Sequence, residues 1–451
     1  MTLLLAALAA LWLQAAPQTP SADEVVTPTG PEAFDMQIAS TGLTNPWQMR
    51  WGPEGFIWVT ERTAGRITRV DPATGARRVA VDIPEAIQRH TQDGVLGLAL
   101  SPTLSTPAGP HTVYVAFTYD ADPGPAEVRR LKVRRYTYSA ATAILSQPVD
   151  IIEGLPAGND HISGRLAFGT DGKLYLTLGD QGLGQLAAYC EPIHAQDLPT
   201  AAEIQQRDWH SYVGKILRIN LDGSIPTDNP LIAGVRSHVF SYGHLNAQGL
   251  AVAPNGRIYA SEHGPSMDDE LNVIRAGGNY GWPYVAGYQD DRVYVYADWS
   301  RSAPQPCASL PWDAIVAPSS VPQQKESAWS SPDFVPPIRT FFTVSAAYSF
   351  SAQGNAVIAP SGIAVYSSPT GIPGWTDSVL VTSLTRGAVY RVKLDASGAA
   401  ATGPSLEYFK TLSRYRDVLV SPDGRTIYLA TDSTSKEHPG AIVAFTFRAP
   451  R

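Results

Sequence analysis

Two acids and a histidine flank one predicted strand-turn-strand unit in the stretch GNDHISGRLAFGTDGKLYLTLGDQG, residues 158–182. Asp160 and His161 precede the unit, and Asp180 follows it. An imidazole with a pKa near neutrality can take a proton from a hydroxyl group, and a carboxylate beside it can fix its tautomer and stabilise the imidazolium that forms. These residue types therefore predict base-assisted oxidation of a hydroxyl. The alternative is a surface loop that carries an ordinary histidine.

The elements that must position these residues are short strands separated by glycine turns. A turn of Pro or Thr, then an acid or amide, then Gly recurs at residues 53–55, 170–172, 254–256 and 422–424. A run rich in β-branched and aromatic residues follows each turn, and glycine supplies the positive φ that such hairpin turns require. Residues 97–102 and 378–394 predict two further units with different turns. The pattern predicts an all-β chain of six hairpin units.

Composition limits the classes of partner. The 451-residue chain carries a net charge of −7, which argues against binding to nucleic acid or to an anionic membrane. Small neutral solutes are the expected partners. Hydrophobic residues make up 44% of the chain, enough for a sizeable core, and 38 glycines and 37 prolines indicate many turns. Because no linker-like composition divides the sequence, we predict one domain over residues 35–450.

The start of the chain and its two cysteines bear on the cellular compartment in which the protein works. Residues 1–22 contain an apolar run too short to span a bilayer comfortably, followed by small and polar residues. This favours an export signal, and hence a periplasmic or secreted protein with no membrane span in the mature chain. No Lys or Arg precedes the run and no Ala-x-Ala site follows it, so an N-terminal anchor is the alternative. Cys190 and Cys307 could form a disulfide or remain separate thiols.

Several longer stretches, in the same order along the chain, resemble the soluble quinoprotein dehydrogenases of the glucose/sorbosone dehydrogenase family. They are LTNPWQMRWGPEGFIWVTERTAGRI (43–67), KILRINLDGSIPTDNP (215–230), GHLNAQGLAVAPNG (243–256), SEHGPSMDDELNVIRAGGNYGWPYVAGYQDD (261–291), ESAWSSPDFVPP (326–337) and RYRDVLVSPDG (414–424). The resemblance implies a six-bladed β-propeller that holds pyrroloquinoline quinone (PQQ) and calcium. Units of roughly 70 residues exceed the ~40–45 residues of a minimal blade, so long loops, at 183–206 and 298–334, are expected over the site.

The resemblance also implies roles for the motif residues. His161 matches the general base that takes the proton from the anomeric hydroxyl of a sugar, and Asp180 matches the acid that orients it. Gln92 and Asp160 match the residues that hold the sugar hydroxyls. The implied activity is oxidation of a sugar or aldose hydroxyl to a lactone or carbonyl, with an unidentified electron acceptor and a possible homodimer.

Two calcium sites follow from the same resemblance. The carbonyls of Gly264 and Pro265 match the ligands of the cofactor-bound calcium, and His263 beside them replaces a Gln. A structural calcium maps to the carbonyls of Ala286 and Tyr288 and the carboxylates of Asp290 and Glu326. Oxygen ligands suit this cation. A solvated acidic turn is the alternative explanation of Asp290 and its neighbour.

The predicted cofactor pocket departs from the family pattern. Asn246, Arg414 and Arg416 match residues that contact PQQ, but Leu245 and Thr385 stand where the family has an Arg and a Lys. At about 1.5–3 kcal/mol for each charged hydrogen bond, their loss predicts weak PQQ binding. The segment SAQGNAVI, residues 351–358, is shorter than its counterpart and lacks its aromatic residues, so the resemblance does not identify the sugar.

Other functions compete with this interpretation. The stretch GLGQLA, residues 182–187, matches a dinucleotide-binding pattern, but prolines and hairpin strands replace the required βαβ context. A calcium-dependent propeller hydrolase, such as a lactonase, would need the acid, the histidine and the metal without a quinone. A non-catalytic sugar-binding propeller that has lost PQQ is the third possibility.

Overall fold

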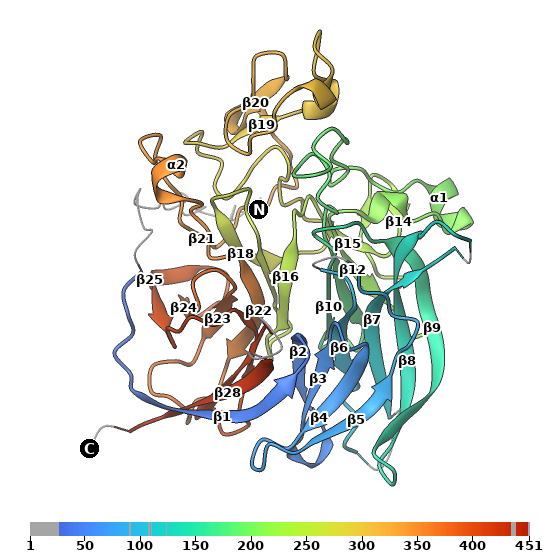
Figure 1. The fold of residues 1–451 in the computed structure, drawn as a ribbon, viewed down its shortest axis with the longest axis vertical. Coiled ribbons are helices and arrows are strands. Elements are labelled where there is room, and N and C mark those ends of the chain that lie inside the picture. Colours follow the sequence, from blue (N-terminus) through green and yellow to red (C-terminus); the bar gives the residue numbers. More distant parts are fainter. Residues whose placement is uncertain are drawn as a thin grey trace, which may run out of the picture.

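The computed structural model describes residues 27–89, 92–106, 109, 111–122, 124–433 and 439–449. The expected export signal, residues 1–22, lies outside them. Strands dominate these residues and form six four-stranded antiparallel sheets around a common centre, the six-bladed β-propeller that the resemblance implied (Figure 1). None of the helices in the described ranges is long and apolar enough to cross a membrane.

The blades follow one another along the chain. Blade one is β2 (Pro46–Trp51), β3 (Ile57–Glu61), β4 (Arg66–Val70) and β5 (Arg77–Asp82); blade two is β6 (Val95–Leu100), β7 (Thr112–Asp120), β8 (Arg129–Ser139) and β9 (Ile144–Pro156); blade three is β10 (Ser163–Phe168), β11 (Leu174–Leu178), β12 (Lys215–Ile219) and β15 (Val239–Tyr242). Blade four is β16 (Ala247–Val252), β17 (Ile258–Glu262), β18 (Asp269–Ile274) and β21 (Arg339–Phe341); blade five is β22 (Pro360–Tyr366), β23 (Ser378–Ser383), β24 (Val389–Leu394) and β25 (Ala401–Tyr408). Blade six is β26 (Tyr415–Val420), β27 (Thr426–Thr431), β28 (Gly440–Phe447) and β1 (Phe34–Leu43). The remaining elements are β13 (Leu231–Ile232), β14 (Val235–Arg236), β19 (Val295–Ala297), β20 (Gln323–Lys325), α1 (Ala201–Gln206) and α2 (Phe350–Gln353).

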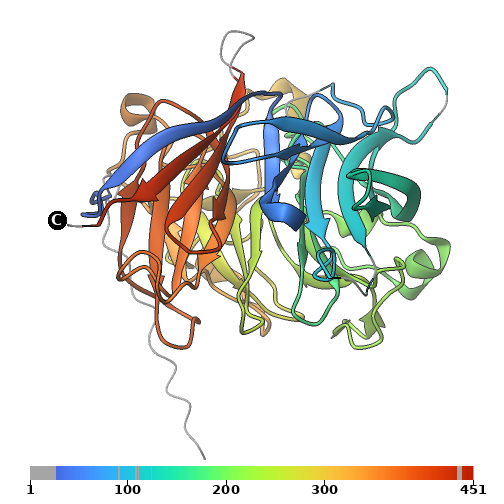
Figure 2. The same cartoon turned by 90° about the horizontal axis from the view of Figure 1, so that it is seen from below.

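The sixth blade contains strands from both ends of the chain. β1 pairs antiparallel with β28, from Phe34 opposite Phe447 to Leu43 opposite Gly440. Figure 2 shows this long N-terminal strand lying along the C-terminal strands. The pairing closes the ring, because it joins the first segment of the propeller to the last.

The innermost strands of the six blades, β2, β6, β10, β16, β22 and β26, contact their neighbours around the central axis. A side chain on Gly97 of β6 would place its Cβ 2.3 Å from the carbonyl oxygen of Gly164 on β10. Only glycine permits so close an approach of two backbones. Arg165 of β10 and Asp417 of β26 form an ion pair of 3.0 Å across this centre, with both side chains buried.

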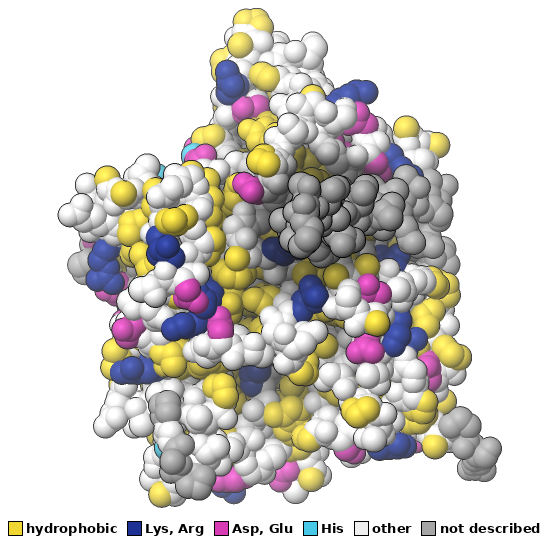
Figure 3. Space-filling view, turned by 180° about the vertical axis from the view of Figure 1, so that it is seen from behind, with side chains coloured by type: hydrophobic (Ala, Val, Ile, Leu, Met, Phe, Trp, Pro, Cys, Tyr) yellow, Lys and Arg dark blue, Asp and Glu magenta, His cyan; other side chains and the backbone are white. Residues whose placement is uncertain are grey.

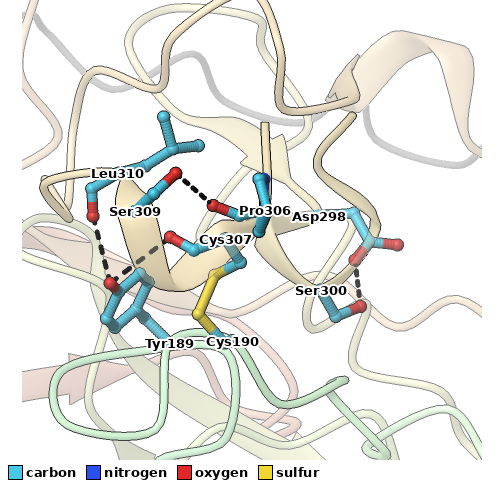
Figure 4. The surroundings of a disulfide bond; sticks show 8 residues. All are labelled: Tyr189, Cys190, Asp298, Ser300, Pro306, Cys307, Ser309 and Leu310. Atoms are coloured by element: carbon cyan, nitrogen blue, oxygen red, sulfur yellow. Dashed lines mark hydrogen bonds between the residues drawn. A yellow bond between two sulfur atoms is a disulfide. The ribbon is translucent and has the colours of Figure 1, made fainter. Parts of the chain in front are cut away.

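A separate layer stands above the propeller, at the top of Figure 1, around β19 and β20. We call residues 294–323 the canopy and residues 183–198 the tether loop. The canopy is an insertion of blade four and the tether loop an insertion of blade three. A disulfide joins Cys190 of the tether loop to Cys307 of the canopy, with their Cα atoms 5.7 Å apart (Figure 4). The structure thus answers the question of cysteine pairing that the sequence left open.

One face of the molecule shows how its charged side chains are distributed. On the face in Figure 3, Lys and Arg side chains are interspersed with Asp and Glu and with hydrophobic groups. Such mixing offers no broad field of one sign to a polyanion.

Candidate active site

The β10–β11 hairpin brings His161 and Asp180 together. His161 lies just before β10 and Asp180 just after β11, and the strands pair Ser163 with Leu178 at this end. Nδ1 of His161 lies 2.8 Å from Oδ1 of Asp180. The pairing of catalytic types predicted from the sequence is therefore present in the structure.

Asp180 is fully buried and accepts three further hydrogen bonds. Its Oδ1 accepts from the backbone N–H of Gly182 at 2.9 Å, and its Oδ2 accepts from Nε2 of Gln185 at 2.8 Å and Nε1 of Trp282 at 2.9 Å. Donors on every side keep the carboxyl group an acceptor, so Nδ1 of His161 donates to it. The lone pair of this tautomer is then on Nε2, which makes no hydrogen bond to any residue that the structure describes.

The charge environment favours a basic imidazole. Burial lowers the pKa of His161, but the carboxylates of Asp180 and Asp160 outweigh burial, so that the pKa is raised from its ordinary value. His161 is 11% exposed at its side chain and lines a cavity. A base with a raised pKa at a cavity wall suits removal of a proton from a small substrate.

The backbone at His161 is strained and is held by side chains. Its φ is 46°, in the left-handed region that few non-glycine residues adopt. Asp160 accepts a hydrogen bond from the backbone N–H of His161 at 2.9 Å, and Nε2 of Gln92 donates to the same carboxylate oxygen. Gln181 bridges the loop from the other side, accepting from the N–H of Gly158 at 2.5 Å and donating to the carbonyl of Gly179 at 2.7 Å. The two predicted substrate residues, Gln92 and Asp160, therefore lie beside the base.

A cavity of about 190 Å³ opens over His161. Its floor includes His161, His263, Gly264 and Pro265, so the predicted base and the predicted carbonyl ligands of a calcium ion share one surface. The tether loop and the canopy form its walls. The canopy contributes the aromatic side chains of Tyr294, Tyr296, Trp299 and Trp312, and Trp282 joins them from outside both segments.

His263 is fixed as a neutral imidazole. Its Nε2 donates to the carbonyl of Pro360 at 2.9 Å, and its ring lies edge-on to that of His161, with centroids 6.4 Å apart. Burial lowers its pKa to about 3, helped by the charge of a protonated His161. His263 therefore stays uncharged at any pH near neutrality and accepts a weak contact from Nδ2 of Asn246 at 3.5 Å.

A chain of polar contacts links the base to the predicted cofactor residues. Gln248 is its centre: its Nε2 donates to Gln92 at 3.1 Å and to Asn246 at 3.3 Å, and its Oε1 accepts from Arg416 at 3.4 Å. Asp432 joins the two predicted arginines, lying 2.7 Å from Arg416 and 3.4 Å from Arg414. The substrate and cofactor residues predicted from the sequence thus form one continuous network.

The cofactor residues differ in what they can present to a ligand. Arg414 is 47% exposed at its side chain, whereas Arg416 is buried against Asp432 and Asn246 is fully buried. Leu245 packs its side chain behind the cavity wall, among Ala195, Trp282, Ala286 and Tyr294. Thr385 is exposed, and its hydroxyl donates a hydrogen bond to the carbonyl of Val357. Neither side chain carries a charge. Guanidinium and amide groups such as those of Arg414, Arg416 and Asn246 are suited to binding carboxylates, and Arg414 is the most exposed of the three.

The residues of the predicted structural calcium site are also gathered. The carboxylate of Glu326 accepts from the N–H groups of Ala286 and Asp290, each at 3.1 Å. Burial raises the pKa of Glu326 to about 7 and also raises the pKa of Asp290. Oδ2 of Asp290 is buried without a hydrogen-bond partner among the described residues and lies 3.3 Å from Nε of Arg292. A buried acid and a half-buried acid that both resist ionisation, the second with an oxygen that lacks a hydrogen bond among the described residues, fit a cation.

Side chains alone do not complete either calcium site. In the described ranges, no group of three or more His, Cys, Asp or Glu side chains could hold a metal ion. Both proposed sites depend on backbone carbonyls at Gly264, Pro265, Ala286 and Tyr288. Carbonyl oxygens are usual calcium ligands.

Several residues of the site were missed in the sequence analysis. Gln248 stands two positions after Asn246, which directly precedes β16, so the period of two of an extended chain could have placed both on one face. Arg62 lies close to Arg416, and its pKa is lowered to about 10 by burial and by the charge of Arg416. No local pattern marks Trp282 or Gln185 as partners of Asp180.

Comparison with known proteins agrees with this geometry. The sequence model of the family described as Glucose / Sorbosone dehydrogenase matches residues 43–334 and 345–443. Quinoprotein glucose dehydrogenase B of Acinetobacter calcoaceticus is 40% identical over 443 residues, which cover 93% of this chain and 92% of that protein. The PQQ-bound form of an aldose sugar dehydrogenase from Streptomyces coelicolor is 26% identical with a TM-score of 0.63, over 93% of this chain and 99% of that one. The apo form of the soluble aldose sugar dehydrogenase from Escherichia coli has the same fold, with a TM-score of 0.66 at 22% identity over 92% and 100% of the two chains.

Proposed function

Because this chain belongs to the glucose/sorbosone dehydrogenase family, and is therefore an oxidoreductase, we propose that it oxidises a hydroxyl of a sugar or aldose to a lactone or carbonyl with the aid of PQQ and calcium. The observation that carries the proposal is the His161–Asp180 pair at the cavity floor, joined by one polar network to Arg416 and Arg414. Family membership favours this oxidation over the hydrolase and the non-catalytic propeller.

The protein side chains handle the proton. Gln92 and Asp160 hold the substrate hydroxyls next to His161, whose Nε2 takes the proton from the hydroxyl that is oxidised. Asp180 keeps the tautomer correct and stabilises the imidazolium, because its carboxylate already lies 2.8 Å from Nδ1. A positioned base of this kind contributes about 10²–10⁴ in rate.

Arg414, Arg416 and Asn246 would hold PQQ, and the carbonyls of Gly264 and Pro265 would hold its calcium ion. Bound PQQ supplies the two-electron acceptor that oxidation of an alcohol requires. The absence of cations at Leu245 and Thr385 supports weaker PQQ binding than the family pattern would give. A second calcium at Asp290, Glu326 and the carbonyls of Ala286 and Tyr288 would stabilise the insertion of blade four. Export to the periplasm or beyond remains our expectation.

Reconstitution tests the function directly. Apo protein is incubated with calcium, with PQQ and with both, and dye-linked oxidation is followed over a panel of aldoses. We expect turnover only with both additions, and a lower melting temperature after exhaustive chelation of calcium. A folded, reconstituted protein that oxidises no aldose would refute the proposal. Asp290→Asn combined with Glu326→Gln should lower the melting temperature without abolishing turnover.

A further inference from the structure

The loop that carries the carbonyls of Gly264 and Pro265 has a strained backbone. Residues 263–268, which we call the calcium loop, join β17 to β18. Within it, φ is 82° at Ser266 and 58° at Asp268, in the left-handed region that few non-glycine residues adopt. Such a conformation persists only where surrounding contacts hold it. The contacts of this loop therefore decide where its carbonyls lie.

One fully buried carboxylate provides such a contact. Asp269, the first residue of β18, has no exposed surface. Its Oδ1 accepts a hydrogen bond from the backbone N–H of Gly264 at 2.8 Å. Its Oδ2 accepts from the backbone N–H of Ile358 at 2.6 Å and from that of Ala359 at 2.9 Å. These bonds offset the cost of burying the carboxylate, and they join the calcium loop to a distant segment.

That segment is fixed by its own blade. Residues 355–359, which we call the anchor segment, lead into β22 of blade five. Nε of Arg386 donates to the carbonyl of Val357 at 3.0 Å, and the hydroxyl of Ser383 donates to the carbonyl of Ile358 at 2.6 Å. The anchor segment is therefore a firm support for the carboxylate that holds the calcium loop.

The neighbouring acid, Asp268, has different surroundings. Its side chain lies against Gly287, where an added Cβ would come within 2.8 Å of it. Gly287 stands between Ala286 and Tyr288, whose carbonyls belong to the proposed structural calcium site. The two adjacent acids thus face different proposed metal sites, and Asp269 is the one that contacts Gly264.

We propose that Asp269 is a positioning residue for the cofactor calcium. By holding the N–H of Gly264 to the anchor segment, it keeps the carbonyls of Gly264 and Pro265 at the cavity floor, where the metal would bind. Its own oxygens are occupied by backbone N–H groups, so it acts through the loop. Calcium takes its oxygen ligands at about 2.3–2.6 Å, and a peptide group that rotates leaves this range. The proposal rests on the function proposed above.

The test is the calcium requirement of PQQ binding. Apo protein at a fixed PQQ concentration is titrated with calcium, and bound PQQ is followed by absorbance. In Asp269→Asn, the new NH2 group replaces one acceptor oxygen and faces a backbone N–H. We therefore expect the calcium concentration at half-saturation to rise at least tenfold, and excess calcium to restore the wild-type absorbance.

Glu61→Gln is the matched control. The side chain of Glu61 is also fully buried and accepts a backbone hydrogen bond, from Thr44 at 2.7 Å, but it belongs to blade one. This variant should lower the melting temperature and leave the calcium requirement unchanged. If Asp269→Asn does not fold, Asp269→Glu, which displaces the carboxylate by one methylene, is judged by the same tenfold criterion.

An unchanged calcium requirement in the folded Asp269 variant would overturn the proposal, and so would a loss of PQQ binding that excess calcium does not restore. If the wild type binds no PQQ, the function proposed above fails, and calorimetric titration of apo protein with calcium decides. In the Asp290→Asn/Glu326→Gln background, one calcium site should remain, and addition of Asp269→Asn should weaken it at least tenfold. No remaining site, or one of unchanged affinity, would refute the role of Asp269.

Discussion

Two buried histidine–carboxylate pairs in the described part of the molecule have the same length but different surroundings. His161 and Asp180 meet at 2.8 Å between Nδ1 and Oδ1, and His244 and Glu262 meet at 2.8 Å between Nδ1 and Oε2. His244 has no exposed side-chain surface, its Nε2 lies 2.9 Å from the hydroxyl of Ser241, and its ring stacks on Tyr280 with centroids 4.5 Å apart. His161 lines a cavity and keeps its Nε2 for a ligand.

The comparison shows that the distance from imidazole to carboxylate does not define a catalytic pair. Both nitrogens of His244 are already used inside the protein, so it can neither reach a substrate nor accept its proton. The strained backbone at His161, with φ of 46°, directs that ring to a site where one nitrogen is accessible. Access and an unused nitrogen distinguish the proposed base from the structural histidine.

Replacement of His161 should give the largest effect. His161→Ala removes the base, so we expect kcat to fall by about 10²–10⁴ while folding and PQQ binding stay near the wild-type values. Dye-linked turnover, together with a PQQ titration followed by absorbance, checks both parts. Activity within tenfold of the wild type would remove His161 from the role of base.

Asp180→Asn should cost less, because the imidazole remains in place. The loss of the carboxylate weakens the base, and each unit by which the pKa of His161 falls costs at most about tenfold in rate. Comparison of kcat between the two single variants gives the ranking. A loss greater than that of His161→Ala would show that Asp180 has a role of its own in the reaction.

The pH profile should change in a defined direction. The base works only when neutral, and the pKa of His161 is raised, so activity of the wild type should decline as pH falls through a value above the ordinary one of about 6.5. In Asp180→Asn the acid limb should move to lower pH, because the largest raising influence is gone. Measurement of kcat against pH in both proteins tests this. If the acid limb lies at the same pH in both proteins, a group other than His161 is responsible for it.

The smallest effect on turnover is expected at the other pair. His244→Ala leaves the buried carboxylate of Glu262 with fewer partners, which should lower the free energy of unfolding by about 1–3 kcal/mol. Activity per folded molecule should stay within a few-fold of the wild type. Denaturant unfolding and active-site titration separate the two quantities, and a loss of kcat comparable to that of His161→Ala would erase the contrast between the pairs.

Much of the fold was readable from local patterns. The turn at residues 170–172 and its counterparts predicted hairpins, and Gly172 adopts the positive φ of 73° that this turn needs. The juxtaposition of His161 and Asp180 was predictable because one hairpin carries both. Long loops at residues 183–206 and 298–334 were expected over the site. The tether loop and the canopy, which overlap these ranges, both line the cavity.

Contacts between blades were beyond prediction from local patterns. Gln248 bonds to Gln92, 156 residues away, and Trp282 bonds to Asp180 across 102 residues. Neither partner is marked by spacing, since the geometry of ring closure alone brings them together. The pairing of Cys190 with Cys307 was open for the same reason, and so was the difference between the His161 and His244 pairs, which depends on what surrounds each ring.

The sixth blade contains β1, the first strand, and β28, the last. It can therefore form only after both strands have been synthesised. A ribosome delivers the chain from its N-terminus, so β1 is made first and stays without its partner until β28 has been produced. During that interval the growing polypeptide is an open arc with two unpaired strand edges, which are prone to pair with other chains. Any truncation before Gly440 would make that arc permanent. The vulnerable period of this protein is therefore the time before β28 emerges.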